Sequence, residues 1–135
     1  SLDYEILIVD DSEIMRETVS DYCIDLDSTP ETVETGEAAV ERLKEREYDL
    51  VFLDVHLPGI DGLETVQEIH KVRPKQGIVL MTTDRGEELF DKATSGGYAV
   101  KGFINKPFSL GIMRVCLKTV LQLKGIFRHR KEGYK

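Results

Sequence analysis

The stretch VFLDVHLPGIDG, residues 51–62, decides how this chain folds. Three consecutive apolar residues, Val51–Leu53, end in the carboxylate of Asp54, and a turn rich in proline and glycine follows. Consecutive apolar residues are typical of a strand buried on both faces, as in a parallel sheet covered by helices. The pattern therefore predicts such a strand and raises the question of why it ends in an acid.

Similar apolar runs recur along the chain and alternate with segments of helical spacing. Further strands are predicted at ILIV (6–9), ETVET (31–35), IVLM (78–81) and GFIN (102–105), the second of them weakly. Apolar residues spaced three and four apart predict helices at 13–27, 36–46, 63–72, 85–96 and about 109–127. Strand–helix–strand connections are right-handed, so this order predicts a (βα)5 fold with a parallel sheet and helices on both faces.

Length and charge suit one domain that does not bind nucleic acid directly. The chain has 135 residues, 41% of them hydrophobic, and a net charge of −7. Residues 1–100 carry 9 Lys and Arg against 24 Asp and Glu, whereas residues 101–135 carry 9 against 1. We expect a domain over 4–127 and a basic C-terminal tail, or the start of a linker, over 128–135. The basic end fits either a solvated surface or contact with an acidic partner.

Cysteine usage and hydropathy favour a cytoplasmic protein. Cys23 and Cys116 lie in apolar helical patterns without Cys or His at metal-ligand spacing, which favours buried thiols. No apolar run approaches the ~20 residues of a membrane span, and no signal peptide precedes the first strand. His70 and His129 are expected at the surface.

The last expected helix has a broad apolar stripe with two interpretations. It can all be core, or part of it can remain exposed for a partner. The stripe comprises Ile112, Cys116, Val120, Leu123 and Phe127, widened by Met113, Leu117 and Leu121.

Polar residues follow four of the predicted strands, at the sheet edge where parallel strands bind ligands. They are Asp10 and Asp11, then Asp54, then Thr82 and Thr83, and finally Lys106 before Pro107. Three crowded carboxylates repel one another, and Mg²⁺ prefers such oxygen ligands. Three carboxylates, one Mg²⁺ and one lysine sum to zero charge. The set suits a phosphoryl group transferred to an Asp nucleophile, with Lys106 and Thr82 binding the other phosphoryl oxygens.

Some of these acids have simpler explanations. Asp10 and Asp11, with Ser12, precede a helix and could serve only as turn and cap residues. Asp61 is predicted to act as a turn or N-cap residue, with Gly62 supplying backbone freedom.

Four motifs in order make the chain resemble the receiver domain of two-component response regulators over about residues 4–127. They are VDDS (9–12), DVHLPGIDG (54–62), MTT (81–83) and NKPF (105–108). The resemblance implies a flavodoxin-like sheet with strand order 2-1-3-4-5. It also implies a phosphoacceptor switch of a phosphorelay, with self-directed phosphotransfer and autodephosphorylation but no enzyme activity on other substrates.

The resemblance implies a role for each site residue. Asp54 is the phosphoacceptor, and Mg²⁺ is bound by Asp11, Asp54 and the main-chain carbonyl of His56, with Asp10 acting through water. Thr82 and Phe103 form the switch, the Lys106-Pro107 peptide is cis, and His56, Thr83 and Asp84 tune the phosphoryl lifetime. Thr83 departs from the small residue usual in the family, and about two extra residues lie near Tyr98–Val100.

Partners also follow from the resemblance. A sensor histidine kinase or phosphotransfer protein would phosphorylate the chain. A downstream protein or output domain, or a second copy of the chain, would bind the face made by the helix at 85–96, the strand at 102–105 and the last helix. No membrane or direct nucleic-acid contact is expected. The alternatives are a receiver-like interaction module that works without phosphorylation and, less well matched, a Mg²⁺-dependent phosphatase. Such phosphatases carry a second acid two residues after the nucleophile, where this chain has Ser12 or Glu13 after its first strand.

Overall fold

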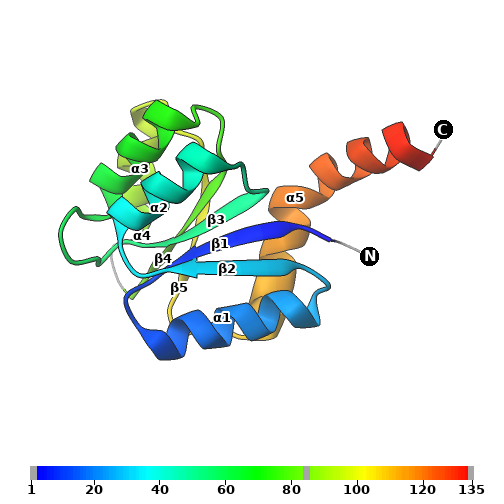
Figure 1. Cartoon of the computed structure of the whole chain (residues 1–135), viewed down its shortest axis with the longest axis horizontal. Coiled ribbons are helices and arrows are strands. Elements are labelled where there is room, and N and C mark those ends of the chain that lie inside the picture. Colours follow the sequence, from blue (N-terminus) through cyan, green and yellow to red (C-terminus); the bar gives the residue numbers. More distant parts are fainter. Residues whose placement is uncertain (1–2, 84–85, 134–135) are drawn as a thin grey trace.

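A computed structural model of the chain describes residues 3–83 and 86–133, with side chains described as far as residue 121. Five strands and five helices alternate (Figure 1). The strands are β1 (Glu5–Val9), β2 (Thr29–Val33), β3 (Leu50–Asp54), β4 (Ile78–Thr82) and β5 (Val100–Asn105). The helices are α1 (Glu13–Asp25), α2 (Gly36–Glu45), α3 (Gly62–Val72), α4 (Gly86–Ser95) and α5 (Leu110–Gly133).

The strands form one parallel sheet in the order β2-β1-β3-β4-β5, which confirms the predicted architecture. Helices α1 and α5 cover one face, and α2, α3 and α4 cover the other (Figure 1). All five residues of β3 and of β4 are buried, because both strands lie inside the sheet between two helical layers. The order places β1 and β3 side by side, so the acids that follow them meet at one edge.

The described part of α5 uses one side of its apolar stripe for the core. Met113, Leu117 and Leu121 are at most 3% exposed and pack on the α1 side of the sheet. Ile112 and Val115 face solvent, with 49% and 61% of their surface exposed. The interpretation that the whole stripe is core is therefore wrong, because Ile112 belongs to the stripe and leaves apolar surface exposed.

The edge strand β2 begins two residues earlier than predicted. Pro30 lies inside it, where the sequence suggested that the strand would follow the proline. An edge strand tolerates proline because one side of its backbone needs no partner in the sheet. The neighbouring Glu31 carboxylate accepts hydrogen bonds from Arg42, from Arg46 at 2.6 Å and from the Tyr48 hydroxyl at 2.7 Å. These contacts join β2 to α2 and to the start of β3.

The loop before β5, where the resemblance implied extra residues, contains a turn and leads into a bulge. Gly97 has a positive φ of 84°, which glycine adopts without strain, and the Tyr98 ring stacks on His70 with centroids 5.6 Å apart. The pairing then skips Lys101, since Ile78 faces Val100 and Val79 faces Gly102. The bulge absorbs one residue and restores the register before the strand reaches the site.

The predicted surface position of His70 is wrong. Its side chain is only 8% exposed, because the Tyr98 ring covers it and its Nε2 lies 2.8 Å from the Gln76 carbonyl oxygen. The pattern of α3 alone does not reveal the ring that the later loop brings in. His129 lies outside the described side chains.

Helix α5 continues to Gly133, so its predicted end at Phe127 is wrong. The apolar periodicity fades after Phe127, but lysine and arginine still favour helix there. The Tyr4 hydroxyl, just before β1, donates to the Leu121 carbonyl at 3.1 Å, and α5 then leaves the body beside the N-terminal ends of the strands (Figure 1).

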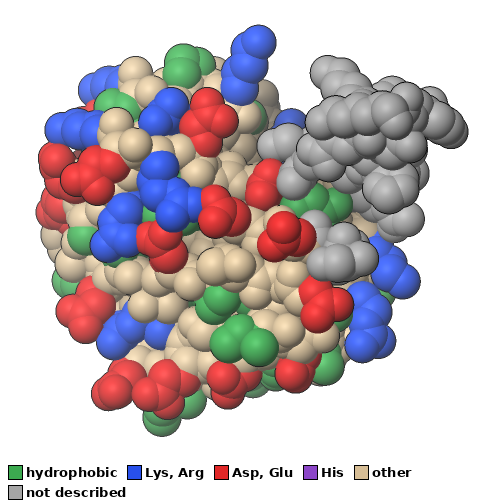
Figure 2. Space-filling view, turned by 45° about the vertical axis from the view of Figure 1, so that its right-hand side comes forward, with side chains coloured by type: hydrophobic (Ala, Val, Ile, Leu, Met, Phe, Trp, Pro, Cys, Tyr) green, Lys and Arg blue, Asp and Glu red, His purple; other side chains and the backbone are tan. Residues whose placement is uncertain are grey.

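The surface is mixed in charge. Figure 2 shows acidic and basic side chains interspersed over one face of the molecule, with small hydrophobic areas between them. Within the described residues, no helix is both long and apolar enough to cross a membrane.

Candidate functional site

Residues from four neighbouring strand ends meet at one edge of the sheet. Asp10 directly follows β1, Asp54 ends β3, Thr82 ends β4 and Lys106 follows β5. The Lys106 N–H donates to the Thr82 carbonyl oxygen at 2.7 Å, which fixes the end of β5 against the end of β4. The structure thus brings together the residues that the sequence placed at this edge.

The Asp54 side chain is buried and held at both oxygens. It is 3% exposed. Its Oδ1 accepts a hydrogen bond from the His56 backbone N–H at 3.0 Å, and its Oδ2 lies 3.2 Å from the Lys106 ammonium. The two contacts fix the orientation of the carboxylate at the tip of β3.

The Lys106 ammonium bridges two carboxylates. Its Nζ lies 2.8 Å from Asp10 Oδ2 as well as 3.2 Å from Asp54 Oδ2, and its side chain is 13% exposed. Asp10 is fully buried, and its Oδ1 accepts from the Ser12 N–H at 2.9 Å. Asp10 therefore does more than form a turn, since it is a buried counter-charge of the lysine.

The charges perturb one another in consistent directions. Burial raises the pKa of Asp54 above its ordinary value, and the charge of Asp10 raises it further, against the lowering effects of the His56 N–H and Lys106. Burial lowers the pKa of Lys106, but its bonds to Asp10 and Asp54 and their charges outweigh burial, so the pKa of Lys106 is raised. The lysine stays charged at neutral pH, and the Asp54 carboxylate is more basic than an ordinary aspartate.

The acidic cluster fits a hard divalent cation. Asp10, Asp11 and Asp54 each offer a carboxylate oxygen, and these oxygens lie within 4.8 Å of one another. Asp11 is exposed whereas the other two are buried, so the cluster opens to solvent on the Asp11 side. Oxygen donors of this kind suit Mg²⁺ rather than zinc. This agrees with the Mg²⁺ site that the resemblance to receiver domains implies.

The expected switch residues lie between the acidic site and α4. Thr82 is fully buried, and Phe103 on β5 is half-buried with its ring 5.9 Å from that of Phe90 on α4. Gly86 allows α4 to begin this close, because a Cβ there would lie 2.5 Å from Thr82 Cγ2 and 2.6 Å from Phe103 Cδ2.

Two of the three residues expected to tune the phosphoryl lifetime lie on the described surface. His56 and Thr83 are exposed. Asp84 lies outside the described residues.

The loops around the site have the predicted local chemistry. The Lys106-Pro107 peptide is cis. Asp61 is the N-cap of α3 and accepts from the Glu64 N–H at 2.9 Å, which confirms its predicted capping role. Gly62 is the exception, since it was predicted to supply backbone freedom but its φ is not positive. Space requires a glycine there instead, because a Cβ would lie 2.6 Å from the Val55 Cα.

Two contacts were not predicted from the sequence. The His56 backbone N–H binds Asp54. Arg16 on α1 donates to the Asp10 carbonyl oxygen at 3.0 Å. The only available signal for Arg16 was a basic residue early in the helix that follows the acid pair.

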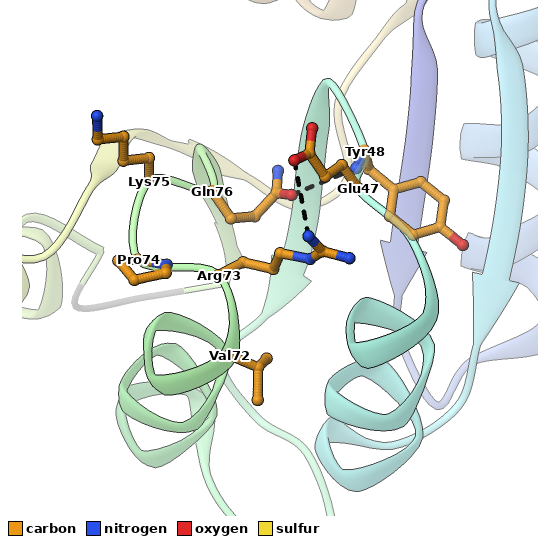
Figure 3. Close-up of a pocket in the computed structure, with 7 residues that line it drawn as sticks. All are labelled: Glu47, Tyr48, Val72, Arg73, Pro74, Lys75 and Gln76. Atoms are coloured by element: carbon orange, nitrogen blue, oxygen red, sulfur yellow. Dashed lines mark hydrogen bonds and ion pairs between the residues drawn. The ribbon is translucent and has the colours of Figure 1, made fainter.

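A surface cavity of about 460 Å³ lies at the other end of the sheet, away from the acidic cluster. It is lined by residues before β3 and before β4, including Arg73 (Figure 3). The Arg73 guanidinium also donates to the Leu43 carbonyl oxygen at 2.7 Å. Its polar groups bond mainly to one another and to the backbone, as in the Tyr48 N–H to Gln76 Oε1 contact at 3.4 Å. The reactive residues named above take no part in it.

Comparisons with known proteins agree with the geometry. A family model described as the response regulator receiver domain matches residues 6–118. The chain is 36% identical over 104 residues to a chemotaxis protein CheY of Halobacterium salinarum, covering 77% of this chain and 85% of that one. It is 32% identical over 109 residues to the autoinducer 1 sensor kinase/phosphatase LuxN of Vibrio campbellii, covering 81% of this chain but 12% of that protein.

Solved structures agree as well. The structure of the Vibrio cholerae chemotaxis protein CheY4 superposes with a TM-score of 0.80 at 26% identity, covering 88% of this chain and 99% of that one. Receiver domains are signalling regulators and are generally not enzymes. The match over residues 6–118, with an acid at the end of β3 and a lysine after β5, means that this chain belongs to the response regulator receiver domain family of two-component systems.

Proposed function

We propose that the chain is a phosphorylation-activated switch that accepts a phosphoryl group on Asp54 from a sensor histidine kinase, a phosphotransfer protein or a small phosphodonor. The observation that carries the proposal is the Asp54 carboxylate itself. It is buried at a strand tip, oriented by the His56 N–H and Lys106, and within 4.8 Å of the oxygens of Asp10 and Asp11.

The reaction is a transfer between two nucleophiles. An oxygen of the ionised Asp54 carboxylate forms a bond to phosphorus, while the bond from phosphorus to the donor nitrogen or oxygen breaks and the donor keeps the electron pair. Mg²⁺ held by Asp11, Asp54 and the His56 carbonyl, with Asp10 acting through water, would offset the negative charge of the carboxylates and phosphoryl oxygens. Lys106 adds a positive charge at the same place, and the Thr82 hydroxyl would bind another phosphoryl oxygen.

The signal would pass from Thr82 and Phe103 to α4. Both side chains touch the position of Gly86, so a shift of Thr82 toward a phosphoryl group opens space at the start of α4. The face formed by α4, β5 and α5 would then change its affinity for a downstream protein, an output domain or a second copy of the chain. Only contacts that differ between the two states can shift this equilibrium.

The lifetime of the phosphoryl group would depend on residues at the mouth of the site. His56 and Thr83 are exposed and would control the approach of water, together with Asp84. Loss of the phosphoryl group by hydrolysis would return the switch to its resting state without a second enzyme.

Intact-mass measurement after incubation with acetyl phosphate and Mg²⁺ tests the proposal. We expect one phosphoryl group on the wild type, none on Asp54→Asn, and none when Mg²⁺ is removed with a chelator. Asp61→Asn is the matched control, since it makes the same chemical change at an exposed capping acid and should be phosphorylated normally. If the wild type gained no mass and also bound no beryllofluoride, the chain would instead be an interaction module that works without phosphorylation.

A further inference from the structure

We infer that Arg16 is a positioning residue of the acidic site, which fixes the turn carrying Asp10 and Asp11 through the Asp10 main-chain carbonyl. The inference rests on the proposed function in one respect, since it takes a divalent cation as the ligand of this turn. The Arg16 guanidinium bonds to the Asp10 carbonyl oxygen and to Glu34 rather than to the reacting carboxylate or Lys106, so it would act only through Asp10.

Each polar atom of Asp10 has a partner, and three of the partners are fixed independently. The Asp10 N–H donates to the carbonyl oxygen of Val33, at the end of β2, at 3.2 Å. The Asp10 Oδ1 accepts from the Ser12 N–H, and its Oδ2 faces the Lys106 ammonium. The fourth atom is the carbonyl oxygen, which accepts from Arg16 Nη1 at 3.0 Å. This bond fixes the plane of the peptide that joins Asp10 to Asp11, and therefore the direction in which Asp11 leaves the turn.

The geometry of the guanidinium indicates positioning rather than a general counter-charge. Its Nη1 binds the carbonyl, while its Nη2 lies 3.1 Å from the Glu34 carboxylate on the connection between β2 and α2. The Arg16 side chain is 15% exposed, although Glu34 is 69% exposed. A planar group with several donors can hold two acceptors at once, which the single ammonium of lysine cannot do in the same geometry.

Positioning and counter-charge predict opposite effects on cation binding. If Arg16 acted mainly as a positive charge near three carboxylates, removing it would strengthen Mg²⁺ binding. If Arg16 holds the turn in its ligating geometry, removing it would weaken binding, as the loss of residues that orient metal ligands usually does.

The experiment measures Mg²⁺ binding to the full chain by calorimetry in the wild type, Arg16→Met, Arg16→Lys and Arg73→Met. Arg73 is the matched control, because it also donates to a main-chain carbonyl and faces a carboxylate, that of Glu47 at 3.6 Å, but at the other end of the sheet (Figure 3). We expect Arg16→Met to raise the Mg²⁺ Kd about tenfold, Arg16→Lys to give an intermediate Kd, and Arg73→Met to leave the Kd unchanged. An unchanged or lower Kd in Arg16→Met would overturn the inference.

A second measurement needs no cation and separates this inference from the proposed function. Amide hydrogen exchange in metal-free protein should be about tenfold faster at Asp10 and Ser12 in Arg16→Met than in Arg73→Met. If the wild type bound no Mg²⁺, the proposed function would fail while the exchange rates still decided the role of Arg16. Equal exchange at these two amides in both variants would show that Arg16 does not hold the turn.

Discussion

Replacing Asp54 by asparagine should stabilise the metal-free protein, although it removes the reactive group. The folded chain holds the Asp54 carboxyl at a pKa above its ordinary value, with burial as the largest cause. Ionising this carboxyl therefore costs more in the folded than in the unfolded chain. The penalty begins as the pH rises past the ordinary value and is complete above the raised one, so this group makes the protein less stable at higher pH.

The structure also sets the size of the effect. Asparagine resembles the protonated acid, keeps an oxygen for the His56 N–H, and leaves Lys106 bonded to Asp10 at 2.8 Å. Because these contacts are kept, the gain should have the size typical of a single substitution, on the order of 1 kcal/mol at pH 7, or about 4 °C in Tm for a domain of this size.

Thermal unfolding followed by circular dichroism, with EDTA and with Mg²⁺, measures the difference in stability between Asp54→Asn and the wild type. Mg²⁺ at a hundred times its Kd should stabilise the wild type by about 2.7 kcal/mol, and Asp54→Asn by less, so the difference between them should shrink or reverse. Asp61→Asn, at an exposed cap that asparagine fills equally well, should stay within about 0.5 kcal/mol of the wild type. A metal-free Asp54→Asn protein that is less stable than the wild type would refute the reasoning.

Three other predictions concern the scaffold. Glu31 has a lowered pKa, because the bonds from Tyr48 and Arg42 and the charge of Arg46 outweigh the effect of burial. The ionised Glu31 therefore stabilises the fold above its ordinary pKa, and this contribution is lost as the pH falls through the lowered pKa. Between pH 6 and pH 3 the free energy of unfolding, measured by urea titration, should fall by about 0.5–1 kcal/mol more in the wild type than in Glu31→Gln. Gly62→Ala should destabilise the protein by about 2 kcal/mol or more in the same assay, because the added Cβ would clash with the Val55 backbone. An unchanged urea midpoint would mean that the loop moves aside without cost. Leu117→Ala should cost about 2–5 kcal/mol and Ile112→Ala under 0.5 kcal/mol, and equal losses would contradict the assignment of the buried side of α5.

The sheet and the reactive edge could be predicted because each strand and its end leave a local pattern in the sequence. Strands buried on both faces leave consecutive apolar residues, and the polar residue that ends each run marks the tip. Asp10, Asp54, Thr82 and Lys106 could be brought together on that basis alone, since the ends of parallel strands meet at one edge. The sequence does not say which carboxylate the lysine bonds more closely, because that depends on side-chain directions across strands that are distant in sequence.

Two of the errors arise from the placement of distant parts of the chain, and the third arises from local helix propensity. His70 is polar and near a helix end, yet a ring from the loop after α4 buries it. Pro30 normally interrupts a strand, but β2 has only β1 as a neighbour and admits it. The end of α5 was placed where its apolar pattern fades, although helix continues where helix propensity suffices.

The two outer strands of the sheet have a consequence for solubility at high concentration. An open edge presents unpaired backbone groups on which another sheet can add. On β2, Pro30 lacks one donor, and the charged Glu31 lies next to it with its arginine partners. On β5, the bulge at Lys101 breaks the regular spacing and leaves a lysine exposed. Both edges thus carry features that oppose the pairing of another sheet with this one.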